Sequence, residues 1–281
     1  MDQERDLGPI REPIVDGIFY PAEREQLRRE IRRLLSESTT SPGDADGIVA
    51  PHASLAYCGR CLASAYRSVS GRPVRRVLIL GPVYRDPEPA LIVPESGGFS
   101  TPLGTIPVID TLETMNASDR LPLLKRDIPH LEEHCLEIQL PFIQYLFPEA
   151  GIIPVLVGDE GPVCYRAVQA LIAELRREGT EDLLMVVSVN LTSTVDVRRA
   201  RQEAGRVVDA LLSQDEAELL AGAEDGSLSA RGLVLLAAVT ESRRESHRVE
   251  LICRESSAAQ LDDPTSTVEY GSFAFFPRSG F

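Results

Sequence analysis

The chain has 281 residues, of which 43% are hydrophobic and 26% are charged, and its formal net charge is -14. This composition provides for a large buried core and argues against extensive disorder. The negative charge disfavours nucleic acid and anionic membranes as partners. The length by itself is compatible with one large α/β domain or with two smaller ones.

The amino terminus and the cysteines indicate the compartment. Residues 1–7 are charged and lack the apolar run of a secretory signal, and no later segment has the roughly 18–20 consecutive apolar residues of a membrane helix. The five cysteines are odd in number and scattered, which favours reduced thiols over a disulfide framework. We therefore expect a cytoplasmic protein without a membrane partner.

In chain order, the sequence predicts short apolar strands that alternate with helices. Residues 1–10 are expected to form a tail, and an amphipathic helix with proline at its start is expected over residues 21–37. The later elements are a strand at 47–50, a helix at 59–66, a strand at 76–80, a hairpin excursion within 90–110, a helix at 132–146, a strand at 152–157, a helix at 163–177, a strand at 183–189, helices at 198–221 and 233–242, and adjacent antiparallel strands at 248–253 and 268–276.

Continuous apolar strands between amphipathic helices are typical of a mainly parallel sheet that is buried on both faces. We therefore predict an α/β fold, with three α/β/α layers and a mainly parallel central sheet, in a single domain over residues 11–281. Sites in such sheets form beyond the carboxyl ends of the strands. The residues to consider for function therefore follow Ala50, Leu80 and Val189.

Short motifs run in collinear order through most of the chain. They are Phe19-Tyr20-Pro21, Ala50-Pro51-His52-Ala53, Tyr57-Cys58-Gly59, Leu80-Gly81-Pro82, Thr101-Pro102-Leu103-Gly104 and the stretch from Glu133 to Phe142. In this order they resemble the Memo family, whose bacterial and archaeal members are called AmmeMemoRadiSam system protein B. The family shares its fold with class III extradiol dioxygenases, which hold non-haem iron. The resemblance implies that fold and a site beside His52, and it does not by itself imply a reaction.

Most of the metal-binding positions that the resemblance implies carry other residues here. Tyr84 stands where the family has a histidine, Asn190 and Ser193 stand where it has an acid and a second histidine, and Ser229 aligns with a cysteine. A catalytic iron or zinc site needs about three His, carboxylate or Cys ligands, and only His52 retains such a donor. We therefore expect no cofactor, with Fe, Zn or Cu as the alternative, and His52 as a metal ligand only if a metal is bound.

Two acids and a histidine near residue 135 allow a second interpretation of this site. His134 can substitute as a ligand from a neighbouring helix, and Glu133 or Glu137 can add a carboxylate, which would give a rearranged metal site. The competing interpretation, which we favour, is that His134 and Glu137 brace this helix against the sheet through hydrogen bonds.

Three further residues have side chains that can take part in chemistry. Cys58 and Cys61 form a C-x-x-C at a predicted helix start, where the helix dipole favours a reactive thiol. The alternative, which we favour, is that the spacing is coincidental and that Cys61 is a small buried residue. His247 lies among arginines and is assigned to solvated surface, with no role.

Two functions are compatible with these residues. The first is a divergent Memo-like protein whose metal site is largely replaced and which serves as a non-catalytic binding or scaffold protein. The second is an enzyme of altered chemistry, either a metal-dependent oxidoreductase of the dioxygenase type or a metal-free catalyst with His52 as the base and Tyr84 and Asn190 as hydrogen-bonding groups. The first is favoured because the replacements are neutral. The partner would be an unknown small molecule or protein, and a homo-oligomer is plausible.

Overall fold

The computed structural model describes residues 7–110, 122–177, 179, 181–259 and 267–278. Its main sheet contains β2 (Gly47–Ala50), β3 (Arg76–Pro82), β4 (Leu91–Val93), β7 (Leu123–Lys125), β8 (Gly151–Val157), β9 (Leu183–Ser188), β10 (Thr192–Thr194), β11 (His247–Ser256) and β12 (Thr267–Pro277). The order across the sheet is β10-β12-β2-β9-β3-β8-β4-β7, and β11 pairs with β12.

The centre of this sheet is parallel and its margins are mixed. Strands β2, β9, β3 and β8 run parallel to one another. On one side β12 pairs antiparallel with β2, β10 and β11, and on the other side β4 pairs antiparallel with β8. The predicted antiparallel pairing of the last two strands is thus confirmed. The central strands are buried on both faces, which explains their continuous apolar sequences.

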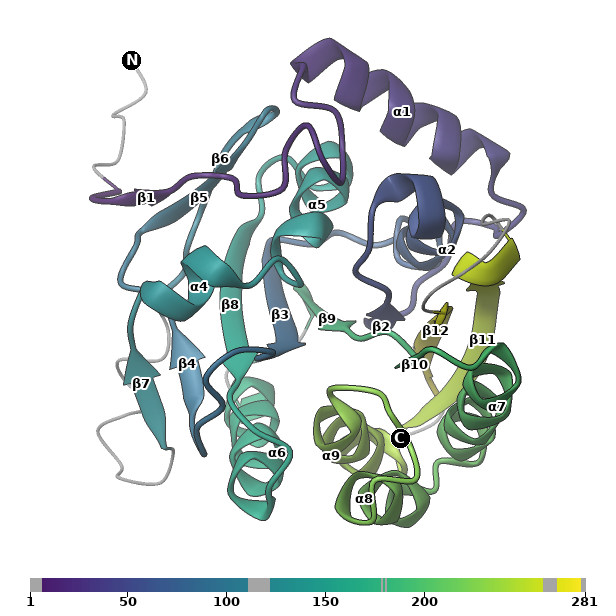
Figure 1. Cartoon of the computed structure of the whole chain (residues 1–281). Helices are drawn as coiled ribbons and strands as arrows, with labels where there is room; N and C mark the ends of the chain where they lie inside the picture. Colours follow the sequence, from purple (N-terminus) through teal and green to yellow (C-terminus); the bar gives the residue numbers. More distant parts are fainter. Residues whose placement is uncertain (1–6, 111–121, 178, 180, 260–266, 279–281) are drawn as a thin grey trace.

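Helices cover both faces of the sheet (Figure 1). One layer contains α1 (Arg24–Glu37), α2 (Leu55–Arg67) and α5 (Leu140–Leu146), and the other contains α6 (Pro162–Arg177), α7 (Val197–Ser213), α8 (Glu216–Glu224) and α9 (Leu233–Arg243). Successive strand residues alternate between the layers, so Ile48 packs in the first core cluster and Val49 in the second. The predicted three-layer α/β/α fold is confirmed.

The excursion predicted within residues 90–110 divides between two sheets. Strand β4 belongs to the main sheet, whereas β5 (Gly98–Thr101) and β6 (Gly104–Pro107) form a hairpin in a smaller sheet with β1 (Ile10–Arg11). Gly104 has a φ of 125°, which side-chain-bearing residues rarely adopt, and this supports the tight turn. Of the predicted tail, residues 1–6 lie outside the described residues, while Ile10 pairs with Gly98.

The continuous helix predicted over residues 132–146 is wrong. Helix α4 (Ile128–Glu132) ends before Glu133, whose backbone is extended, and a 3-10 turn, η1 (Glu137–Gln139), leads into α5. Pro141 near the start of α5 has no N–H to give to a preceding turn, so it favours a new helix start. Because the helix is broken here, the carboxylates of Glu133 and Glu137 can contact other parts of the chain.

Other predicted boundaries also shift. The helix predicted at 198–221 divides because Gln214 ends α7 in the left-handed region, with a φ of 55°, and the side chain of Asp215 caps α8. Helix α2 starts at Leu55 because Ser54 caps it, and β3 extends through Pro82. In the part of the chain that the structure describes, no helix combines the length and apolar composition needed to cross a membrane.

Candidate functional site

A cavity of about 170 Å³ lies where the parallel strands end. His52, Tyr84 and Asn190 each stand two residues beyond the last residue of β2, β3 and β9, so the shared sheet edge brings them together. The cavity is lined by His52, Tyr84, His134, Asn190, Thr192, Ser193, Ser229, Ala230 and Arg231. The structure therefore gathers the five main candidates and His134, whereas Glu133 does not line the cavity.

The hydrogen bonds of His52 define its tautomer. Its Nδ1 lies 3.2 Å from Ser188 Oγ and its Nε2 lies 2.8 Å from the Tyr84 hydroxyl. The Ser188 hydroxyl donates to the Cys135 carbonyl at 2.6 Å and accepts from Gln139 Nε2 at 2.9 Å. Since the serine proton is already used, His52 Nδ1 must be the donor to Ser188. The unprotonated Nε2 then accepts the hydrogen bond of Tyr84.

Burial keeps these groups uncharged. His52 is 2% exposed, and burial together with the neighbouring His134 lowers the pKa of His52 to about 3. The two imidazole rings meet edge to face with centroids 5.8 Å apart, and burial lowers the pKa of His134 as well. Tyr84 is 39% exposed as a residue, but desolvation of its hydroxyl beside His52 raises the pKa of the phenol. At neutral pH the cavity therefore presents two neutral imidazoles and a protonated phenol.

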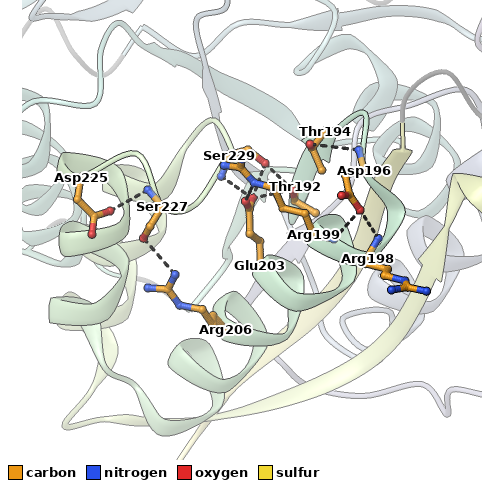
Figure 2. A network of polar contacts seen from close by, with 10 residues as sticks. All are labelled: Thr192, Thr194, Asp196, Arg198, Arg199, Glu203, Arg206, Asp225, Ser227 and Ser229. Atoms are coloured by element: carbon orange, nitrogen blue, oxygen red, sulfur yellow. Dashed lines mark hydrogen bonds and ion pairs between the residues drawn. The ribbon is translucent and has the colours of Figure 1, made fainter.

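Hydrogen bonds within the cavity wall hold Asn190 and Ser229 in place. Asn190 Oδ1 accepts the backbone N–H of His52 at 3.0 Å, which leaves the amide NH₂ as its remaining donor. Figure 2 shows that Ser229 and Thr192 converge on Glu203, a buried carboxylate of α7. Ser229 donates both its hydroxyl, at 2.6 Å, and its backbone N–H, at 2.9 Å, to Glu203 Oε2. The Ser229 hydroxyl proton is therefore used in the hydrogen bond to Glu203.

Glu133 acts on the site through the backbone. Its Oε1 accepts the backbone N–H groups of Tyr84 at 2.7 Å and Arg85 at 2.9 Å. These two bonds hold the loop that follows β3, and so they place the Tyr84 hydroxyl against His52. Glu133 is a positioning residue for this loop.

Glu137 binds the amino-terminal segment, which corrects the expectation that it braces a helix against the sheet. Its carboxylate pairs with the buried Arg11 and accepts the Tyr20 hydroxyl at 2.6 Å. The backbone N–H groups of Ile14 and Val15 also donate to it, at 2.9 and 3.1 Å. Its oxygens are thereby occupied by groups from residues 11–20.

The donor set beside His52 does not fit the metal centre that the Memo resemblance implies. His52 Nδ1 carries the proton and Nε2 accepts the Tyr84 hydroxyl, while Glu133 and Glu137 are bound to N–H, O–H and guanidinium groups. Among the described residues, the grouping of three close metal-ligating side chains is Cys61, Cys253 and Glu255, which do not line this cavity.

Of two expectations for residues outside the cavity, the one that Cys61 is a small buried residue agrees with the structure, and the assignment of His247 does not. The thiol of Cys58 donates to the Ala53 carbonyl at 3.3 Å, whereas Cys61 donates to Cys253, so the hydrogen bonds do not join the C-x-x-C pair. The assignment of His247 to solvated surface is wrong, because the residue is buried and its Nε2 lies 3.0 Å from Asp46 Oδ2. The arginines near His247 in the sequence did not indicate that its partner is the distant Asp46.

Four residues of the site escaped the sequence analysis. Ser188 orients His52, and Thr192, Ala230 and Arg231 line the cavity. Ser188 and Thr192 lie within two residues of Asn190, a position that the Memo resemblance marks, so their neighbourhood was a usable signal. Arg231 lies two residues after Ser229, and no local pattern marked it as a site residue.

Comparisons with known proteins cover most of the chain. The family model described as Memo-like protein matches residues 11–274. A MEMO1 family protein of Thermoplasma acidophilum is 27% identical over 264 residues, which is 93% of this chain and 97% of the relative. A MEMO1 family protein of Thermotoga neapolitana is 30% identical over 220 residues, which is 73% of this chain and 78% of the relative. The crystal structure of an uncharacterized protein from Escherichia coli K12 has a TM-score of 0.51 and 13% identity, and the match covers 81% of this chain and 98% of that chain. The last likeness concerns the fold alone.

Proposed function

We propose that this chain, which belongs to the Memo-like protein family, binds a small anion in the cavity beside His52 without a metal and without catalysing a reaction. The observation that carries the proposal is the state of His52, whose two ring nitrogens are both used in hydrogen bonds to Ser188 and Tyr84. A metal ligand needs a free lone pair, and here the lone pair of Nε2 already accepts a hydrogen bond from the Tyr84 hydroxyl.

The lining favours an anion of modest size. Arg231 is the residue with a full charge among the lining residues, and the Asn190 NH₂ group and the Ser193 hydroxyl provide neutral donors. Pockets for drug-sized ligands have volumes of roughly 300–1,000 Å³, whereas this cavity has about 170 Å³. A small carboxylate or oxyanion, held by Arg231 and oriented by the amide and hydroxyl, suits both the size and the donors.

Binding is better supported than general acid–base catalysis. A catalytic base works best when its pKa lies near the operating pH, but burial and His134 hold the pKa of His52 at about 3. The raised pKa of Tyr84 means that the phenol keeps its proton.

The five cysteines are not in disulfides, which supports a reducing cytoplasmic compartment for this binding protein.

Calorimetric titration with acetate, malonate and phosphate tests the proposal. We expect saturable binding of at least one of them, unchanged by a chelator and weakened about tenfold or more in Arg231→Ala, which corresponds to loss of a charge-assisted contact. Arg166→Ala is the matched control, since Arg166 is an exposed arginine of α6 that does not line the cavity, and it should bind as wild type does. Equal binding by Arg231→Ala and wild type would refute the anion site.

Metal analysis separates the alternatives. After incubation with Fe²⁺, Zn²⁺ or Cu²⁺ and removal of excess metal, we expect no stoichiometric metal that is lost on His52→Ala. Such a metal would overturn the proposal. Turnover of a bound compound that His52→Asn abolishes while binding persists would instead establish the metal-free enzyme.

A further inference from the structure

Two cysteines that are distant in sequence meet between a helix and a strand. Cys61 of α2 and Cys253 of β11 lie with their sulfur atoms 2.7 Å apart, and Cys61 is the donor. Cys61 is buried, and Cys253 is partly exposed. The register of β11 against β12 shifts between Leu251 and Cys253, and bulges of this kind re-aim a side chain.

The surroundings favour a thiolate at Cys253. The hydrogen bond from Cys61 lowers the pKa of Cys253, and the guanidinium of Arg60 lowers it further, while burial and Glu255 oppose the shift. The same hydrogen bond and burial raise the pKa of Cys61. Arg60 is held by an ion pair with Glu255, with Nε and Oε1 2.7 Å apart. Cys253 is thus the nucleophilic sulfur and Cys61 the protonated partner.

A cavity gives access to this pair. It has a volume of about 250 Å³, and its lining includes Cys253, Arg60 and Arg254 together with polar residues at and just after the end of α1. The cavity does not share lining residues with the one beside His52. A small polar oxidant therefore has a route to Cys253 that is independent of the anion site.

We propose that Cys61 and Cys253 form an oxidisable dithiol site whose substrate is a hydroperoxide. The Cys253 thiolate attacks one oxygen of the peroxide, the O–O bond breaks, the other oxygen leaves as hydroxide or alkoxide, and Cys253 becomes a sulfenic acid. The Cys61 sulfur then attacks the Cys253 sulfur, an S–S bond forms, the S–O bond breaks, and water leaves with the Cys61 proton. Two electrons pass from the sulfur atoms to the peroxide, which is reduced.

A soft metal ion is the competing occupant, since Glu255 completes a set of three donors with the two cysteines. Two thiolates on one tetrahedral zinc, with bonds of about 2.3 Å, stand roughly 3.8 Å apart, which is farther than the 2.7 Å between these sulfurs. Arg60 also adds a positive charge beside Cys253 and occupies Glu255. Both features favour sulfur chemistry over a cation.

The test is oxidation of the pre-reduced full chain with hydrogen peroxide. We expect the number of free thiols to fall by two, the intact mass to fall by two hydrogens, and peptide mapping to find Cys61 joined to Cys253. A dimedone probe should label Cys253 in Cys61→Ser, Cys253→Ser should not form the intramolecular bond, and Arg60→Ala should react several-fold more slowly.

Cys58→Ser is the matched control on the same helix, because burial raises the pKa of Cys58 to about 12 and its thiol donates to Ala53. It should react as wild type does. A disulfide that involves Cys58 or Cys164, or the absence of any disulfide in wild-type protein, would overturn the proposal even if a serine variant failed to fold. So would stoichiometric Zn²⁺ that is lost in Cys253→Ser and protects both thiols from peroxide.

Discussion

The neutral state of His52 predicts how the stability of the protein depends on pH. Burial and the nearby His134 lower the pKa of His52 to about 3 in the folded protein, whereas an unfolded histidine takes up its proton near pH 6.5. A difference of about 3.5 pKa units corresponds to roughly 4–5 kcal/mol. Because the folded pKa is the lower one, this stability is complete above about pH 6.5 and is lost as the pH falls towards 3.

Urea denaturation of wild type and His52→Asn between pH 7.5 and 4 measures this contribution. Asparagine keeps a donor where Nδ1 faces Ser188 but has no group that titrates in this range. We expect the free energy of unfolding of the wild type to fall by up to about 1.4 kcal/mol per pH unit more than that of the variant. Nitrogen-detected NMR should show the Nδ1–H tautomer of His52 down to pH 5. A midpoint near 6.5 for His52, or equal pH dependence of the two proteins, would refute the reasoning.

Substitutions at four positions away from the cavity give further predictions. Glu137→Gln leaves the buried charge of Arg11 without its partner and should lower the free energy of unfolding by about 3–5 kcal/mol in urea; an unchanged midpoint would argue against the buried pair. Burial opposes ionisation of Asp46, but the hydrogen bond with His247 and the charge of Arg243 outweigh it and lower the pKa of Asp46 to about 2. About 2 kcal/mol of stability, present above about pH 4, should therefore disappear as the pH falls towards 2, and Asp46→Asn should lack this acid-dependent loss. Gly158→Ala would drive a methyl group into the carbonyl oxygens of Glu88 and Ala90, and calorimetry should find the variant destabilised by about 1–3 kcal/mol. In Gly205→Ala the added methyl group meets nothing within 4 Å in α7, so this variant should be as stable as wild type or more stable. A Gly205→Ala variant less stable than Gly158→Ala would contradict the packing.

The parallel centre of the fold was predictable because its signal is local. Strands β2, β3, β8 and β9 are short apolar runs, and burial on both faces requires such runs wherever they occur. The same reasoning placed His52, Tyr84 and Asn190 at one sheet edge, since parallel strands end together. A rule about strand ends thus predicted the clustering without knowledge of any distance.

The features that could not be predicted depend on partners far away in the chain. The helix predicted over 132–146 breaks where Glu133 and Glu137 bind backbone groups that lie 48 to 123 residues earlier in the sequence. Cys61 and Cys253 are separated by 192 residues, and Asp46 and His247 by 201. Local periodicity contains no information about such pairs, so the burial of Cys61 was predictable and its contact with Cys253 was not.

The replaced positions in the cavity act as a set. A buried neutral imidazole needs one acceptor and one donor, and Ser188 and the Tyr84 phenol provide them for His52. Asn190 accepts the backbone N–H of His52, and the Ser229 hydroxyl joins Thr192 and Arg199 as a donor to the buried carboxylate of Glu203, so each neutral replacement makes a hydrogen bond within the cavity wall. Changing one of them towards a metal ligand would break one of these bonds without completing a donor set. This mutual dependence is the physical basis for our proposal that the cavity works without a metal.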